Sequence, residues 1–274
     1  MTLQATDFSF VTQMVRQRSS IDLQPGKEYL VESRLAPIAR SLGEKDVAGL
    51  VARLRRGEPG LTDAVVDALT TNVTSWFRDS HPFDAFVQHL LPDVAGTSAT
   101  KQITVWSAAC SSGQEAYSLA MLMLDWLPTR PGYSARIVGT DISATMVERA
   151  RAGRYSQLEV NRGLRAPYLV KYFDQTGRDW VLRPQVREVC RFERGNLAQP
   201  ATNVPTCDIV FLRNVLIYFE LDTKRTVLSH IRKVLRPGGF LVLGGAESTL
   251  NLDDAFQRTE LGRAVVFRHT GGAA

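Results

Sequence analysis

Apolar residues in the first third of the chain recur with the period of a helix. Phe8, Val11 and Val15 follow one another at i, i+3 and i+7, and this spacing places them on one helix face. Three further segments have a similar pattern, at residues 30–42, 47–54 and 63–69. Glycine or proline separates these segments, so the pattern predicts a bundle of short amphipathic helices.

From about residue 101, short apolar strands alternate with helices. The expected strands are ITVWSA, ARIVGTD, CDIVFLRN and GGFLVLGG, and the expected helices cover residues 114–126, 144–152 and 223–235. This alternation predicts an α/β fold with a doubly wound, mostly parallel sheet that is covered on both faces. The small polar stretch GTSAT marks a boundary. We therefore expect an N-terminal all-helical domain with its linker over residues 1–92, and the sheet domain over 93–274.

Residues 155–192 interrupt this alternation. Their aromatic and apolar residues are scattered around two turn signals, QTGRD and RPQ. The segment is either a small β-rich insertion in the second domain or an irregular connection, and the pattern favours neither.

Composition and charge exclude several classes of protein. With 44% hydrophobic and 22% charged residues, the chain has the composition of a soluble globular protein. The 33 basic and 28 acidic residues give a net charge of +5, without the dense basic stripe of a dedicated nucleic-acid binder. Three widely spaced cysteines without a CxxC motif disfavour a disulfide framework and a zinc site. The sequence shows no signal peptide and no apolar run of ~18 residues, so we expect a cytoplasmic protein without membrane insertion.

Polar residues follow several of the expected strands, where ligands bind in a doubly wound sheet. The first strand runs into SAACSSGQE, whose small residues allow a tight turn before a helix N-terminus. Asp141 ends the second strand, where a carboxylate accepts ribose hydroxyl protons or caps the next helix. Arg213 and Asn214 end a later strand, and Tyr218 follows them. Buried polar residues there need partners, which are either a ligand or structural hydrogen bonds.

The helical region ends in the polar segment TTNVTSWFR, residues 70–78. Its hydroxyl and amide side chains fit a capped, kinked helix junction. Alternatively, Arg78 faces a carboxylate of a cofactor or a substrate.

Four segments in this order carry a specific resemblance: TTNVTSWFR, VWSAACSSGQEAYSLAM, FLRNVLIYF and LRPGGFLVLGGAES. Together they span most of the chain, and on them it resembles the chemotaxis receptor methyltransferases (CheR-type), which methylate glutamates of bacterial chemoreceptors. The resemblance implies a helical N-terminal domain and a class I methyltransferase domain that uses S-adenosylmethionine and releases S-adenosylhomocysteine. It also implies a small antiparallel β-subdomain, which suits residues 155–192.

The resemblance also implies site residues. Carried over position by position, the cofactor-binding residues are Asn72, Thr74, Arg78, Glu115, Asp141, Asn196, Leu197, Arg213 and Asn214, and the catalytic residues are Arg78 and Tyr218. The chain departs from the family at two positions. The family usually has TNET where this chain has Val73 in place of the glutamate, and GEEPYS where it has Gln114 in place of the first glutamate. Both departures remove a carboxylate beside the cofactor segments, but Glu115, Asn72 and Thr74 remain. We therefore expect cofactor binding to be retained and leave its affinity open.

Methyl transfer to a glutamate needs little chemical machinery. A glutamate side chain has a pKa near ~4.3 and is already a carboxylate nucleophile at neutral pH. Neither a general base nor a metal is therefore expected, and catalysis comes mainly from orientation.

The implied function is transfer of a methyl group to glutamates on chemoreceptor cytoplasmic helices. Two alternatives remain open: a non-catalytic module that binds S-adenosylmethionine or S-adenosylhomocysteine, and a nucleic-acid methyltransferase. No nucleic-acid partner is expected, because no aromatic and basic platform is evident. The loop Asp174–Asp179 is short, and family members with a shorter loop there tend not to dock on a peptide at the receptor C-terminus. We therefore expect no tight dependence on that peptide.

Overall fold

The computed structural model describes residues 3–98 and 100–271. Contacts divide it into two compact units, one reaching to Thr71 and including Tyr218–Thr223, the other comprising Asn72–Ile217 and the residues from Lys224 onward. The division lies at Thr71, whereas the sequence placed the boundary after residue 92. The reason is that residues 81–97 form helices whose apolar side chains pack into the core of the sheet unit. Residues 96–98 and 100 of the GTSAT stretch therefore belong to this unit, and its residue 99 lies outside the described residues.

The smaller unit contains the four expected helices. They are α1 (Ala5–Ser19), α2 (Glu28–Ser41), α3 (Val47–Arg55) and α4 (Leu61–Leu69). Val11, Val15 and Leu50 of the predicted apolar faces are fully buried, and Ile38 and Leu42 are partly buried against the same core. Arg34 extends from α2 and donates hydrogen bonds to the last carbonyls of α4, those of Leu69 (3.0 Å) and Thr70 (2.8 Å). It thus satisfies acceptors that the helix end leaves open.

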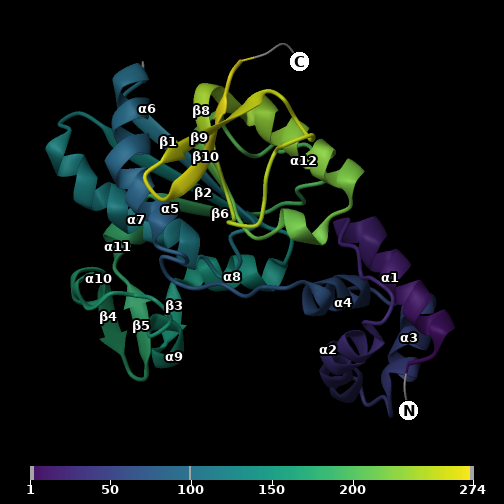
Figure 1. The fold of residues 1–274 in the computed structure, drawn as a ribbon. Coiled ribbons are helices and arrows are strands. Elements are labelled where there is room, and N and C mark those ends of the chain that lie inside the picture. The colour runs from purple at the N-terminus through teal and green to yellow at the C-terminus, as the bar shows by residue number, and fades with distance from the viewer. Residues whose placement is uncertain (1–2, 99, 272–274) are drawn as a thin grey trace. The chain divides into compact units, whose positions relative to one another are not determined.

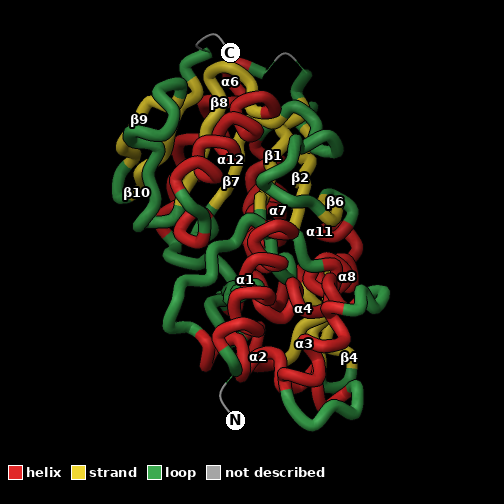
Figure 2. Tube along the Cα trace, turned by 90° about the vertical axis from the view of Figure 1, so that its right-hand side faces the viewer, coloured by secondary structure: helices red, strands yellow, loops and turns green. Residues whose placement is uncertain are grey.

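The larger unit is built on a seven-stranded sheet with the order β6-β2-β1-β7-β8-β10-β9. The strands are β1 (Gln102–Ala108), β2 (Ser134–Asp141), β6 (Cys190–Arg194), β7 (Cys207–Leu212), β8 (Leu235–Leu243), β9 (Phe256–Leu261) and β10 (Ala264–His269). The first five are parallel, and β10 runs antiparallel to both β8 and β9. Figure 2 shows β7, β1, β2 and β6 following one another across the sheet. This arrangement confirms the doubly wound α/β prediction.

Helices cover both faces of this sheet (Figure 1). They are α5 (His81–Ala85), the π-helix Phe86–Leu90, α6 (Leu91–Thr97), α7 (Gln114–Trp126) with the 3-10 turn Leu127–Thr129, α8 (Ala144–Ala152) and α12 (Leu221–Val234). Alternate residues of β1 point to opposite faces. Val105 lies in the core with α7, whereas Trp106 faces Val227 and Ile231 of α12. The strand order reverses at β1, so the carboxyl ends of β1 and β7 form the switch point at which ligands bind in such sheets.

The interruption after α8 is a small antiparallel sheet with the order β3-β5-β4. Its strands are β3 (Arg154–Ser156), β4 (Phe173–Thr176) and β5 (Asp179–Leu182), with helices α9 (Gln157–Val160), α10 (Ala166–Tyr172) and α11 (Pro184–Arg187) around it. The β-subdomain that the resemblance implies is therefore confirmed, and the segment is not an irregular connection. The last residues of the expected range differ, because Cys190–Arg194 forms the edge strand β6 of the main sheet.

Candidate functional site

The turn after β1 brings two backbone segments together at the switch point. Ser111 is left-handed (φ 50°), and so is Gly113 (φ 95°), which precedes α7. A Cβ on Gly113 would lie 3.0 Å from the Cβ of Ala150, so glycine is required both by conformation and by space. The Ser111 hydroxyl donates to the Asn72 carbonyl (2.9 Å). The first expected strand end is thereby tied to the segment that contains Asn72.

Asp141 ends β2 and lies beside this turn. It is 5% exposed. Its Oδ2 accepts the Ser111 N–H (2.8 Å), and its Oδ1 accepts the Ser143 N–H (2.9 Å). The carboxylate therefore fixes the turn after β1, while the cap of α8 is made by the Ser143 hydroxyl, which accepts the Met146 N–H. Asp141 is not the N-cap that the sequence allowed.

Glu115 and Arg213 form an ion pair across the switch point. The Arg213 side chain is 1% exposed and donates from Nη1 to Glu115 Oε2 (3.2 Å). Glu115 Oε1 in turn accepts the Ser107 hydroxyl at the end of β1 (2.8 Å). Because buried charges are costly unless they are paired, this pair fixes α7 relative to the end of β7.

Arg213 also holds the loop that carries Arg78. Its Nη2 donates to the Arg78 carbonyl (2.9 Å) and to Asp79 Oδ2 (2.7 Å). Phe77, Asp79 and Ser80 of this loop all have positive φ, a conformation that costs energy for residues other than glycine. The Arg78 side chain is half-buried and donates to the Val73 carbonyl (3.3 Å). The guanidinium has five N–H donors, so most of them remain for a ligand.

Asn72 and Thr74 line a cavity of about 220 Å³. Val73 and Gln114, the two positions at which we expect departures from the family pattern, line the same cavity, and so does Arg149. Val73 and Gln114 are thus neighbours in space although they are 41 positions apart in the sequence (114 − 73).

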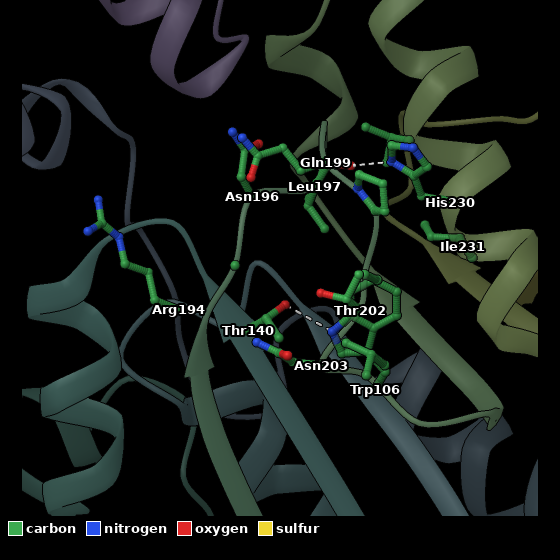
Figure 3. Close-up of a pocket in the computed structure, with 15 residues that line it drawn as sticks. Trp106, Thr140, Arg194, Asn196, Leu197, Gln199, Thr202, Asn203, His230 and Ile231 are labelled. Atoms are coloured by element: carbon green, nitrogen blue, oxygen red, sulfur yellow. Dashed lines mark hydrogen bonds between the residues drawn. The ribbon is translucent and has the colours of Figure 1, made fainter.

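Asn196 and Leu197 line a second cavity, of about 140 Å³, beyond the end of β6 (Figure 3). Its other walls include Trp106 and His230. Dashed lines in Figure 3 mark the bond from Trp106 Nε1 to Thr140 Oγ1 (2.9 Å) and the contact of His230 Nδ1 with the Leu197 carbonyl (3.2 Å). Of the expected cofactor residues, Asn72 and Thr74 thus line one cavity, and Asn196 and Leu197 line another.

Asn214 is held by Glu247, a residue that was not predicted from the sequence to belong to the site. Asn214 is left-handed (φ 59°), and its N–H donates to Glu247 Oε2 (2.7 Å). Glu247 also accepts the N–H groups of Val215 (2.8 Å) and Gly244 (2.8 Å). It lies just after β8 in the segment LGGAES. The rule that polar residues after strand ends form the site would have found it.

Tyr218 ends the 3-10 turn Leu216–Tyr218 and belongs to the smaller unit. Its carbonyl accepts the N–H of Asp22 (3.1 Å), and the next residue, Phe219, pairs with Ile21. Tyr218 is therefore not among the residues that the larger unit brings together.

Two models of known families match consecutive parts of the chain. The CheR methyltransferase all-alpha domain matches residues 6–70, and the CheR methyltransferase SAM-binding domain matches residues 72–265. The chain belongs to the CheR methyltransferase family. Its activity is accordingly that of a chemotaxis protein methyltransferase, and its cosubstrate is S-adenosylmethionine.

Relatives with this description match nearly the whole chain. It is 39% identical over 266 residues to chemotaxis protein methyltransferase 1 of Pseudomonas aeruginosa, a match that covers 96% of this chain and 97% of the relative. It is 32% identical over 262 residues to the chemotaxis protein methyltransferase of Escherichia coli, a match that covers 93% of this chain and 89% of that relative. No helix in the described ranges could cross a membrane. Nor does any group of three or more metal-binding side chains gather within residues 3–98 and 100–271.

Proposed function

We propose that the protein transfers the methyl group of S-adenosylmethionine to glutamate carboxylates on the cytoplasmic helices of chemoreceptors. The observation that carries this assignment is the network at the switch point. It joins Glu115, Arg213 and the Arg78 loop through hydrogen bonds of 2.7–3.2 Å, inside a chain that matches the family over nearly its whole length.

Two groups near this network fit the methionine part of S-adenosylmethionine. Asn214 Oδ1 is buried without a hydrogen-bond partner among the described residues, and an orphaned acceptor suits the ammonium group. The guanidinium of Arg78 suits the carboxylate. Asp141, at the end of β2, is the proposed acceptor for the ribose hydroxyls. Asn72 and Thr74 belong to the methionine side, and Asn196 and Leu197 to the adenine side.

The reaction is an in-line displacement. An oxygen of the substrate carboxylate attacks the methyl carbon, the carbon–sulfur bond breaks, and its electron pair returns to sulfur, giving the glutamyl ester and S-adenosylhomocysteine. No proton is transferred, so the protein needs to orient the reactants rather than to supply a base. Arg78 orients the methionine carboxylate of S-adenosylmethionine. The assignment of Tyr218 to the methyl path rests on the resemblance alone. The partner is the cytoplasmic helical part of a chemoreceptor, so the protein acts in the cytoplasm.

The short hairpin turn of the small sheet bears on how the receptor is engaged. β4 ends at Thr176 and β5 begins at Asp179, so Gly177 and Arg178 alone join the two strands. We propose that this protein does not depend tightly on a peptide at the receptor C-terminus. Binding of such a peptide to the isolated protein at micromolar concentration would contradict this.

The test of the function separates binding from transfer. Calorimetric titration measures the affinity for S-adenosylmethionine in the wild type and in Asp141→Asn, which keeps the size of the side chain. We expect about tenfold weaker binding in the variant, equivalent to about 1.4 kcal/mol. Receptor fragments are then incubated with methyl-labelled S-adenosylmethionine, and base-labile label is counted. Binding without labelling of any receptor fragment would identify a non-catalytic binding module, for which the neighbouring substitutions Val73 and Gln114 would be the reason.

A further inference from the structure

A third cavity, of about 280 Å³, lies beyond the end of β8 and is not used by the residues assigned above to the cofactor. Leu243, Val265 and Phe267 form its apolar part. Arg258 of β9 and Arg263 of the β9–β10 turn also line it. Figure 1 shows this hairpin in yellow. The cavity therefore combines apolar walls with cationic side chains.

The charge of this cavity suits an anionic ligand. Glu247 also lines it, but its carboxylate oxygens already accept three backbone N–H groups. Arg258 donates to Glu260 two residues along the same strand (2.7 Å), and the two side chains are 57% and 66% exposed. Exposed pairs of this kind contribute little, so a ligand carboxylate can replace Glu260. Arg263 is exposed, without a partner in the described part of the chain.

The cavity shares a wall with the candidate active site. A Cβ built on Gly244, which lines the cavity, would lie 2.7 Å from the side-chain amide nitrogen of Asn214. On another wall, His81 begins α5 only two residues after Asp79, the partner of Arg213. A ligand here therefore lies close to the residues that we assign to methyl transfer.

We propose that this cavity binds an acidic side chain of the methyl-accepting protein, one that neighbours the glutamate undergoing methylation. The inference rests on the proposed function and adds a determinant of substrate choice. Arginine pairs with a carboxylate through two parallel hydrogen bonds, and the apolar wall accommodates the methylene groups of the same side chain. An acceptor segment rich in Glu and Asp is bound, and one with amides at the flanking positions is bound less well.

The test compares the double variant Arg258→Gln/Arg263→Gln with Arg191→Gln. Arg191 is a matched control because it is also an exposed arginine paired with a glutamate two residues along its strand, Glu193, and it lies on β6 away from the cavity. Two acceptors are used: a receptor fragment with acidic residues flanking the methylation site, and the same fragment with those residues changed to Gln and Asn. Affinity for S-adenosylmethionine is measured by calorimetry, and acceptor binding by fluorescence anisotropy as well as through KM.

We expect the double variant to bind the acidic acceptor about tenfold less tightly, to bind the amide acceptor as the wild type does, and to keep its affinity for S-adenosylmethionine. Unchanged binding of the acidic acceptor would overturn the proposal, as would an equal loss with both acceptors. Weaker binding of S-adenosylmethionine would overturn it too, because the arginines would then serve the cosubstrate. Since anisotropy needs no turnover, the result stands even if the wild type methylates neither fragment, an outcome that would count against the proposed function instead.

Discussion

The Glu247 carboxylate holds the backbone of Asn214 in a left-handed conformation. Oε2 lies 2.7 Å from the Asn214 nitrogen, and the same carboxylate binds the N–H groups of Val215 and Gly244. A non-glycine residue at φ 59° costs on the order of 1 kcal/mol or more. Glu247 thus positions Asn214, whose buried amide oxygen has no hydrogen-bond partner among the described residues and is our proposed ligand for the ammonium group.

In Glu247→Gln, an amide NH2 group replaces one carboxylate oxygen and faces backbone N–H groups, which it cannot accept. At least one of the three hydrogen bonds is lost, and Asn214 relaxes from its left-handed conformation. We expect the affinity for S-adenosylmethionine to fall about tenfold or more, since the loss of a charge-assisted hydrogen bond typically costs about 1.5–3 kcal/mol. The exposed pair residue Glu148 provides the control variant Glu148→Gln. Equal affinities in the two variants would show that Glu247 does not act through Asn214.

Gly244 and Gly245 give a second test of the same contact. A Cβ on Gly244 would lie 2.7 Å from Asn214 Nδ2 and 2.9 Å from its backbone nitrogen, whereas a Cβ on Gly245 meets nothing within 4 Å. Gly244→Ala is therefore expected to weaken cosubstrate binding, and Gly245→Ala to leave it unchanged. Calorimetry measures the affinity of both variants for S-adenosylmethionine, and thermal melting checks that each is folded. Equal affinities in the two variants would contradict the prediction.

Arg213 is expected to contribute to stability because its charge is buried. Lysine at this position cannot reach Glu115, Asp79 and the Arg78 carbonyl at once, since a single ammonium replaces a planar guanidinium. Disruption of a buried pair costs about 3–5 kcal/mol when a charge is left unpaired. Asp79 is 46% exposed and Glu115 is 14% exposed, so we expect Arg213→Lys to lose about 2–3 kcal/mol of unfolding free energy. In urea titrations, the exposed control Arg191→Lys should change the unfolding free energy by less than about 1 kcal/mol.

Gly163 determines how the Trp76 segment meets the small sheet. A Cβ there would lie 2.2 Å from the Trp76 carbonyl oxygen, and φ is +99°. Gly163→Ala must therefore displace the segment leading to Arg78, and we expect both lower stability and weaker cosubstrate binding. Gly177→Ala is the control, because its φ is also positive (+65°) and its Cβ would meet nothing within 4 Å. If both variants bind equally well, the contact with Trp76 has no influence on the site.

The elements of the fold that follow from local pattern were predicted from the sequence. The periodicity that identifies α1 begins at Phe8, and the apolar run of β1 is buried on both sides. Strand β6 was missed because its sequence, CRFER, has charged residues at three of five positions. Such a strand is stabilised by pairing with its neighbour in the sheet, here Arg191 and Phe192 with Val138 and Gly139 of β2. Pairing with a neighbour is not visible in local composition.

Contacts between residues distant in sequence explain what was missed in the site. The resemblance assigned Arg213 to the cofactor, but it did not indicate that Arg213 binds Asp79 and the Arg78 carbonyl, 135 residues away in the sequence. Likewise, Glu247 is separated from Asn214 by 33 residues and acts on its backbone. A motif identifies which residues lie at the strand ends, whereas the hydrogen bonds between them depend on the fold.

The buried cysteines give a prediction about pH. Burial, with a smaller effect from the Asp208 carboxylate, raises the pKa of the Cys207 thiol to about 12, and burial also raises the pKa of Cys110. Near pH 9 the Cys207 thiol is then almost wholly protonated in the folded protein, whereas most of it is ionised in the unfolded chain, where its pKa is about 8.5. We expect iodoacetamide to label both residues much more slowly in the native than in the unfolded protein. Because the unfolded state loses these protons first, the unfolding free energy should decrease as pH rises from about 9 towards 12. Site-resolved mass spectrometry measures the labelling, and rapid native labelling of Cys110 at pH 9 would contradict its burial beside the Asp141 turn.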